Sequence, residues 1–144
     1  MDTKIDFKNP EFYENRELSW IKFDNRVLSE ARDKSIPLLE RLKFVSITSS
    51  NLDEFFMVRV ASLLDMVHAN YKKRDIAGMT ATEQLAAINK ETRELVDTQY
   101  STYTRSLVPL LNKEGIYLVD EHETLTDEQA AFVDRYFMES VYPR

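Results

Sequence analysis

The chain has 144 residues, of which 43% are hydrophobic and 31% charged, with a formal net charge of −6. This balance is typical of a globular domain rather than a disordered chain, and the acidic charge argues against a basic nucleic-acid surface. Cysteine is absent, which excludes disulfides, thiolate metal sites and a cysteine nucleophile. Only two glycines and four prolines are present, and this scarcity favours helices over a turn-rich β-fold.

The first predicted elements are an irregular arm and a helix. Pro10 and mixed polar content indicate that residues 1–13 form the arm. Apolar residues then recur at helical spacing, which predicts a helix that begins between residues 14 and 19 and ends near Arg32. After a short connection, Ser35 is a candidate N-cap, and Pro37 suits the first turn of the next helix.

The second helical region is predicted from Pro37 to about Tyr71, and a block of polar residues interrupts its apolar pattern. Short hydroxyl and amide side chains compete with helical hydrogen bonds, so we expect a break or bend near residues 48–50. Asn51 would then be an N-cap and Glu54 would complete a capping box. Asp53, in the first turn of that new helix, would favour the positive end of the helix dipole.

A basic loop and a third long helix follow. The Lys72-Lys73-Arg74 triplet could meet phosphates, although a solvated helix end is the simpler interpretation. Thr80 or Thr82 is expected to cap the helix, whose near-heptad stripe becomes polar in its second half and could form a weaker or a partner-facing seam. Pro109 should kink or end this helix, and Gly115 should mark its exit.

The last predicted elements are a short extended segment at residues 116–119 and a helix from Thr126 to about Val141. Thr126 and Gln129 form the capping signature of that helix. The sum is an all-α bundle of four or five helices, with long antiparallel helices. We expect an arm at 1–13, a helical domain at 14–125, and a last helix at 126–144 that leads towards a missing following domain.

The sequence offers few groups for catalysis. His68 and His122 are far apart and have no convincing metal-binding neighbours, and the two glycines rule out a glycine-rich phosphate loop. Asp53 and Glu54 are consecutive, so on a helix they would not converge on one substrate atom. We therefore predict no catalytic residue and no metal site.

Asn51 is the main candidate for binding. Its amide offers both a donor and an acceptor, which can match the edge of an adenine, and Phe44 could supply an apolar face for the base. On a continuous helix the two residues would share a face with Ile47 and Phe55, at spacings of three, four and seven.

Several ordered blocks of the sequence resemble one known family. They are NRELSWIKF at residues 15–23, RVL at 26–28, IPLLERLKF at 36–44 and SSNLDEFFMVRV at 49–60. These blocks are similar to the N-terminal domain of the long, histidine-phosphorylating polyphosphate kinases. The resemblance is close from Asn15 to Ser62 and looser up to GIYLV at residues 115–119.

The resemblance implies an enzyme that transfers the terminal phosphate of ATP to polyphosphate through a phosphorylated histidine. That histidine and the magnesium site of the full-length enzyme belong to later domains, so this domain would be inert alone and would bind no metal. In the family this domain supplies part of the nucleotide pocket. The ATP-binding asparagine corresponds to Asn51, and Phe44 is a second expected ATP contact.

The resemblance also implies partners for the full-length enzyme, and one alternative function is open. We expect ATP or ADP and polyphosphate as partners of the full-length enzyme, together with its own downstream domains, homo-oligomer contacts and no nucleic acid. No apolar run approaches the roughly 20 residues that span a bilayer. We expect a cytoplasmic protein, with membrane association at full length left open. The alternative is a purely structural docking or dimerisation domain without nucleotide contact.

Overall fold

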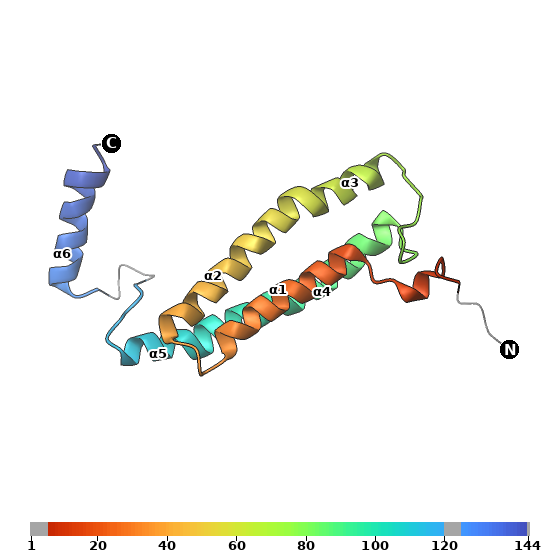
Figure 1. Ribbon diagram of the computed structural model, residues 1–144. Coiled ribbons are helices and arrows are strands. Elements are labelled where there is room, and N and C mark those ends of the chain that lie inside the picture. Colours follow the sequence, from red (N-terminus) through yellow and green to blue (C-terminus); the bar gives the residue numbers. More distant parts are fainter. Residues whose placement is uncertain (1–5, 120–124, 144) are drawn as a thin grey trace. The chain divides into compact units, whose positions relative to one another are not determined.

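The computed structural model describes residues 6–119 and 125–143, and the chain divides into two compact units, Met1–Leu110 and Leu111–Arg144. Within the described residues every regular element is a helix and none is a strand, and helices α1 to α4 pack together in the first unit. The predicted all-α bundle is therefore confirmed (Figure 1). No helix in 6–119 or 125–143 is both long and apolar enough to cross a membrane.

The first helix has the predicted position. After a 3₁₀ turn at Pro10–Phe12 (η1), α1 spans Arg16–Arg32. The side-chain oxygen of Asn15 accepts hydrogen bonds from the backbone N–H groups of Glu17 and Leu18, both at 3.0 Å. These bonds satisfy donors that the helix itself leaves free, which explains why it begins there.

The second helical region is more continuous than predicted and ends at His68, slightly before the predicted Tyr71. α2 (Leu38–Phe55) leads without a gap into a π-helical turn, η2 (Phe56–Val60), and then into α3 (Ala61–His68). Pro37 is the N-cap of α2 and makes no side-chain cap bond. The prediction that Ser35 caps this helix is wrong, because both its backbone N–H and its hydroxyl donate to the Asp33 carboxylate at 2.8 Å.

The predicted break near residues 48–50 is also wrong. Thr48 is fully buried, and its hydroxyl donates to the carbonyl of Phe44 one turn earlier at 2.9 Å. This bond satisfies the hydroxyl inside the helix, so it does not compete with the backbone bonds. Asn51 consequently lies inside α2 rather than at a helix start, and neither its predicted capping box with Glu54 nor the first-turn role of Asp53 exists.

The third helical rod begins where the sequence predicts. α4 (Ala81–Thr102) opens with a complete capping box between Thr80 and Glu83, and continues through a π-helical turn, η3 (Tyr103–Leu107), into α5 (Val108–Lys113). Pro109 does not end the helix. The widened turn η3 ends two residues before the proline and includes the carbonyl four residues before it, which the proline ring would crowd in a regular helix.

The exit from α5 follows the predicted glycine signal. Gly115 has a φ of +78°, and the N–H of Ile116 donates to the carbonyl of Leu111 at 2.9 Å. This six-residue closure is the Schellman arrangement, which needs a left-handed residue that glycine adopts without a steric penalty. The helix exit at Gly115 is therefore confirmed.

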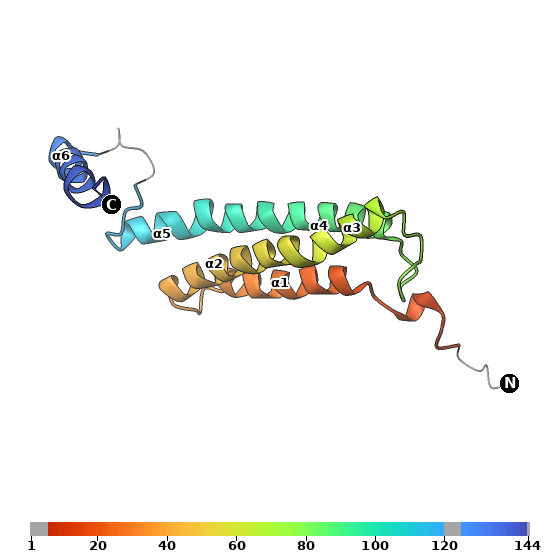
Figure 2. The same ribbon diagram turned by 90° about the horizontal axis from the view of Figure 1, so that it is seen from above.

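The core of the first unit lies between the three helical rods. α1 contacts both α2 and α4, and α4 contacts α3, so α4 returns antiparallel to the α2–α3 rod (Figures 1 and 2). The polar half of the α4 stripe lies inside this core, since Thr92, Gln99 and Thr102 are buried. Gln99 donates to the carbonyl of Val45 at 3.0 Å, so of the two alternatives for this half of the stripe the partner-facing one is wrong. The largest fully buried apolar side chains of this unit are Phe55, Ile21, Leu28, Ile88, Leu95 and Leu107.

The second unit contains the predicted last helix. α6 (Asp127–Tyr136) opens with the capping box of Thr126 and Gln129 and continues into a π-helical turn, η5 (Phe137–Val141). Neither element contains a buried residue, so their apolar side chains face outward from this unit. The described residues 116–119 form no regular element.

Candidate functional site between helices α1 and α2

Asn51 joins the first two helices. Its Nδ2 donates to Oδ1 of Asp24 on α1 at 2.9 Å, and the Asn51 side chain is half-buried. An ionised carboxylate can accept hydrogen bonds but cannot donate them. The amide nitrogen of Asn51, rather than its oxygen, therefore faces Asp24. Its Oδ1 and its second amide hydrogen have no partner among the described residues.

Asp24 is the buried half of this pair. The residue is 0% exposed, and its Oδ2 accepts no hydrogen bond from the part of the chain that the structure describes. Burial raises the pKa of Asp24, and the hydrogen bond from Asn51 partly offsets that rise. The charged form of Asp24 therefore depends on Asn51, because no other described donor compensates its loss of water.

Asn51 lines a cavity of about 290 Å³ between α1 and α2–η2, which we call the Asn51 groove. Three of its lining residues are aromatic. Trp20 and Phe55 stack with ring centroids 4.3 Å apart and planes 6° apart, and Phe23 lies exposed at the rim. The groove therefore combines a fixed amide with flat apolar surfaces, and is lined by Trp20, Phe23, Asn51, Glu54, Phe55, Val58 and Arg59.

An ion pair with the buried carboxylate of Glu17 fixes Arg59, the cation that lines the groove. The Glu17 side chain is 4% exposed and accepts from Nη1 of Arg59 at 2.9 Å and from Nη2 of Arg16 at 2.6 Å. Arg16 is itself 81% exposed, whereas Arg59 is 35% exposed and lines the groove. Glu17 on α1 thus positions the guanidinium of Arg59, which lies on η2, at the groove.

Phe44 lies outside this groove. It is partly buried, packs against the hydrophobic core, and is two helical turns before Asn51, about 10 Å along the axis. Because α2 is continuous, Phe44 and Asn51 have the seven-residue spacing that places them on the same side of the helix. Phe44 nevertheless does not line the cavity that contains Asn51. The role of Phe44 in nucleotide binding stays a prediction.

The other candidates make no catalytic constellation in the structure. Glu54 lines the groove, Asp53 is exposed, and His68 is exposed at the end of α3. His122 lies outside the described residues. No group of three His, Asp or Glu side chains in ranges 6–119 and 125–143 is placed to hold a metal ion.

Sequence reasoning missed Asp24, Trp20, Phe23 and Arg59 as parts of this site. The signal was present, because all four lie in or beside the NRELSWIKF and SSNLDEFFMVRV blocks. What the sequence could not supply was the pairing of α1 with α2, which is needed to place them on one groove.

The first unit is thus an all-α module with a polar and aromatic groove between two antiparallel helices. Residues 13–119 match the family model described as the polyphosphate kinase N-terminal domain. The chain belongs to this family.

Several similar proteins are named polyphosphate kinase. The chain is 51% identical over 139 residues to one from Lactiplantibacillus plantarum and 48% identical over 140 residues to one from Bacillus anthracis. Each alignment covers 96% of this chain but only 19% and 20% of those relatives. The crystal structure of polyphosphate kinase from Porphyromonas gingivalis superposes with a TM-score of 0.74 at 32% identity, covering 90% of this chain and 18% of that one.

Proposed function

We propose that this chain supplies one wall of the ATP site of a polyphosphate kinase, which transfers the terminal phosphate of ATP to polyphosphate. The observation that carries this proposal is the amide of Asn51, held by Asp24 at 2.9 Å in a groove with aromatic walls. Family membership supports the reaction, and the groove supports the part of the substrate that this module would contact.

The chemistry of the groove suits an adenine. An adenine edge offers an amine donor next to a ring-nitrogen acceptor, and an asparagine amide can pair with both. Asp24 occupies one hydrogen of the Asn51 amide, which leaves its oxygen for the adenine amine and its second hydrogen for the ring nitrogen. The half-buried ring of Trp20, which stacks on the buried Phe55, and the exposed ring of Phe23 offer the apolar surface that a base needs, since bases stack favourably on aromatic side chains.

This module would position ATP without touching the transferred phosphate. The contacts proposed for the base come from Asn51, Trp20 and Phe23, which are uncharged, and the phosphorylated histidine and magnesium expected from the resemblance would lie in later domains. A single wall buries too little of a ligand to bind it tightly, so the chain alone should bind ATP weakly and catalyse nothing.

The test uses a complete polyphosphate kinase that contains this chain. Asn51→Ala by itself would leave the Asp24 carboxylate without a donor, so it is compared with the double variant Asp24→Ala/Asn51→Ala, which removes both groups. We expect both variants to raise the KM for ATP about tenfold, the effect of losing one good base contact, while the KM for polyphosphate stays constant. An unchanged KM for ATP in either folded variant would show that Asn51 does not read the base.

A docking role has its own support, and it comes from the second unit. Phe132, Tyr136 and Phe137 on α6 and η5 are 57%, 56% and 49% exposed, which is unusual for large aromatic side chains on one short helix. Under a purely structural role, the Asn51 variants would lower the melting temperature and leave the KM for ATP alone. Measuring both quantities on the same samples separates the two functions.

A further inference from the structure

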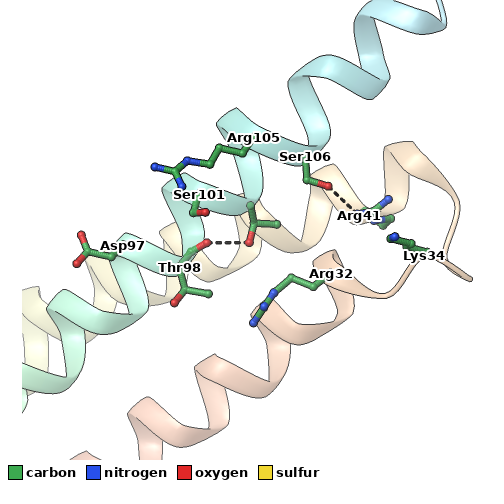
Figure 3. A pocket seen from close by; sticks show the side chains of 9 residues that line it. Arg32, Lys34, Arg41, Asp97, Thr98, Ser101, Arg105 and Ser106 are labelled. Carbon is green, nitrogen blue, oxygen red and sulfur yellow. Dashed lines mark hydrogen bonds between the residues drawn. The ribbon is translucent and has the colours of Figure 1, made fainter.

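A cavity of the first unit that is larger than the Asn51 groove lies away from it and is lined mainly by cations and hydroxyls. Its volume is about 500 Å³, within the range of roughly 300–1,000 Å³ typical of ligand sites. Figure 3 shows side chains from the end of α1, the following loop and α2 on one side, and from α4 and η3 on the other. The lining residues are Arg32, Lys34, Arg41, Asp97, Thr98, Ser101, Thr102, Arg105 and Ser106, and we call the site the Arg41 groove.

The charge of this groove is opposite to that of the chain. Four of the lining side chains are cationic and one, Asp97, is acidic, whereas the whole chain has a net charge of −6. No cation of the groove forms an ion pair with any carboxylate in the described part of the chain. The groove is therefore a local excess of positive charge that an anion would neutralise.

Arg41 makes the groove more than a patch of exposed charges. The residue is 5% exposed, and its Nε donates to the carbonyl of Ala31 at 2.8 Å while its Nη2 donates to the hydroxyl of Ser106 at 3.3 Å. Its remaining N–H groups have no partner among the described residues, although a guanidinium has five. Hydrogen bonds from Ser35 lower the pKa of Asp33, and the charge of Arg41 adds a smaller effect, so a carboxylate lies within electrostatic reach of the guanidinium without forming an ion pair with it. Buried charges in proteins are normally paired, so a fixed guanidinium with free N–H groups favours the binding of a further anion.

The surrounding groups match a chain of phosphates. Arg32 and Arg105 are exposed at the cavity and can each grip two oxygens of one phosphate, and Lys34 adds a point charge. The hydroxyl of Ser101 makes no hydrogen bond within the described residues and is free to donate. The cations come from α1, the loop, α2 and η3, so they face the cavity from more than one side (Figure 3).

We propose that the Arg41 groove binds inorganic polyphosphate and holds a stretch of the substrate chain away from the nucleotide. This inference rests on the proposed function for the identity of the phosphate chain. Arg41 and Asn51 are ten residues apart on α2, about 15 Å along its axis, and no residue lines both grooves. The two sites can therefore be changed independently.

The test titrates the 144-residue chain at low salt with inorganic polyphosphate, and in separate arms with ATP. The variant Arg32→Ala/Arg105→Ala removes two exposed cations of the groove and leaves the buried Arg41 in place. Its matched control, Lys72→Ala/Lys73→Ala, removes two exposed cations from the loop after α3, at the opposite end of the bundle (Figure 1). Circular dichroism confirms that each variant is folded, and Arg32→Lys/Arg105→Lys keeps the charge while removing the guanidinium forks.

We expect the groove variant to bind polyphosphate about tenfold more weakly, because each partly exposed charge contact contributes a few-fold. The control should stay within about twofold of the unchanged chain, and the lysine variant should lie between the two. Equal losses in the groove variant and the control would overturn the proposal in favour of unspecific charge attraction. A loss of ATP binding that equals the loss of polyphosphate binding would also overturn it, since the groove would then hold nucleotide phosphates.

The outcome is separable from that of the nucleotide proposal. Asn51 variants are judged by the KM for ATP, and the Arg41 groove by direct binding of polyphosphate. A chain that loses polyphosphate binding in the groove variant while the Asn51 variants leave the KM for ATP unchanged would support this inference and refute the assigned role of Asn51.

Discussion

Replacing Asn51 by alanine should destabilise the helical bundle through Asp24. The change removes the only described donor to a carboxylate that is 0% exposed, at a bond length of 2.9 Å. A hydrogen bond to a charged group contributes about 1.5–3 kcal/mol, and the lost bond leaves the acceptor without water. We therefore expect the free energy of unfolding to fall by about 2 kcal/mol near neutral pH, and the melting temperature to fall by roughly 5–10 °C.

The pH dependence of this loss distinguishes its mechanism. Burial raises the pKa of Asp24 above its usual value, and the Asn51 bond lowers it again in part. A raised folded-state pKa means that the contribution of Asp24 to stability is fully present below the unfolded-state pKa and is lost as the pH rises through the folded-state pKa. Removing Asn51 raises that pKa further, so the deficit of the variant should be small in acid and grow towards neutral pH.

Urea unfolding followed by circular dichroism at about pH 3 and about pH 7.5 measures this difference. Ser50→Ala is the control, because Ser50 is exposed on the same helix and its change should stay within about 0.5 kcal/mol at both pH values. A deficit for Asn51→Ala that is below about 1 kcal/mol and equal at the two pH values would refute the reasoning. It would mean that the Asp24–Asn51 bond does not carry the loss.

Four further substitutions test other contacts. Arg59→Ala should cost about 1–3 kcal/mol in urea unfolding because it removes a partner of the buried Glu17, whereas Arg16→Ala should cost under about 1 kcal/mol because Arg16 is 81% exposed; equal effects would contradict this ranking. Thr80→Ala should cost about 1 kcal/mol as a lost N-cap of α4, and an unchanged unfolding midpoint would show that the capping box contributes nothing. Gly78→Ala should lower the melting temperature, since its φ is +79° and a Cβ would lie 3.2 Å from a side-chain atom of the N-terminal segment, and a rise would contradict the strain argument.

Local signals in the sequence were sufficient to place most helix ends. The N-caps at Thr80 and Thr126 and the exit at Gly115 all depend on residues within six positions of one another, so their chemistry can be read before any tertiary contact is known. The all-α class follows from the same local patterns. The motif blocks also pointed to the family to which the chain belongs.

Tertiary structure decided the meaning of the polar block in α2. Read locally, residues 48–54 contained all the groups of a helix start. In the bundle Thr48 is buried and bonds back within its own helix, so the helix continues. The Asn51 amide donates to Asp24, which lies on a different helix, instead of capping a helix start.

Both candidate sites depend on pairings that no short stretch of sequence contains. Asn51 lines one groove with Trp20 and Arg59 because α2 and η2 pack against α1. Arg32 lines another with Arg105 because α4 and η3 return past the end of α1. The sequence by itself determined which segments are helical, since capping and periodicity are local. Only the packing decided which polar side chains share a groove, because that depends on contacts between residues far apart in the chain.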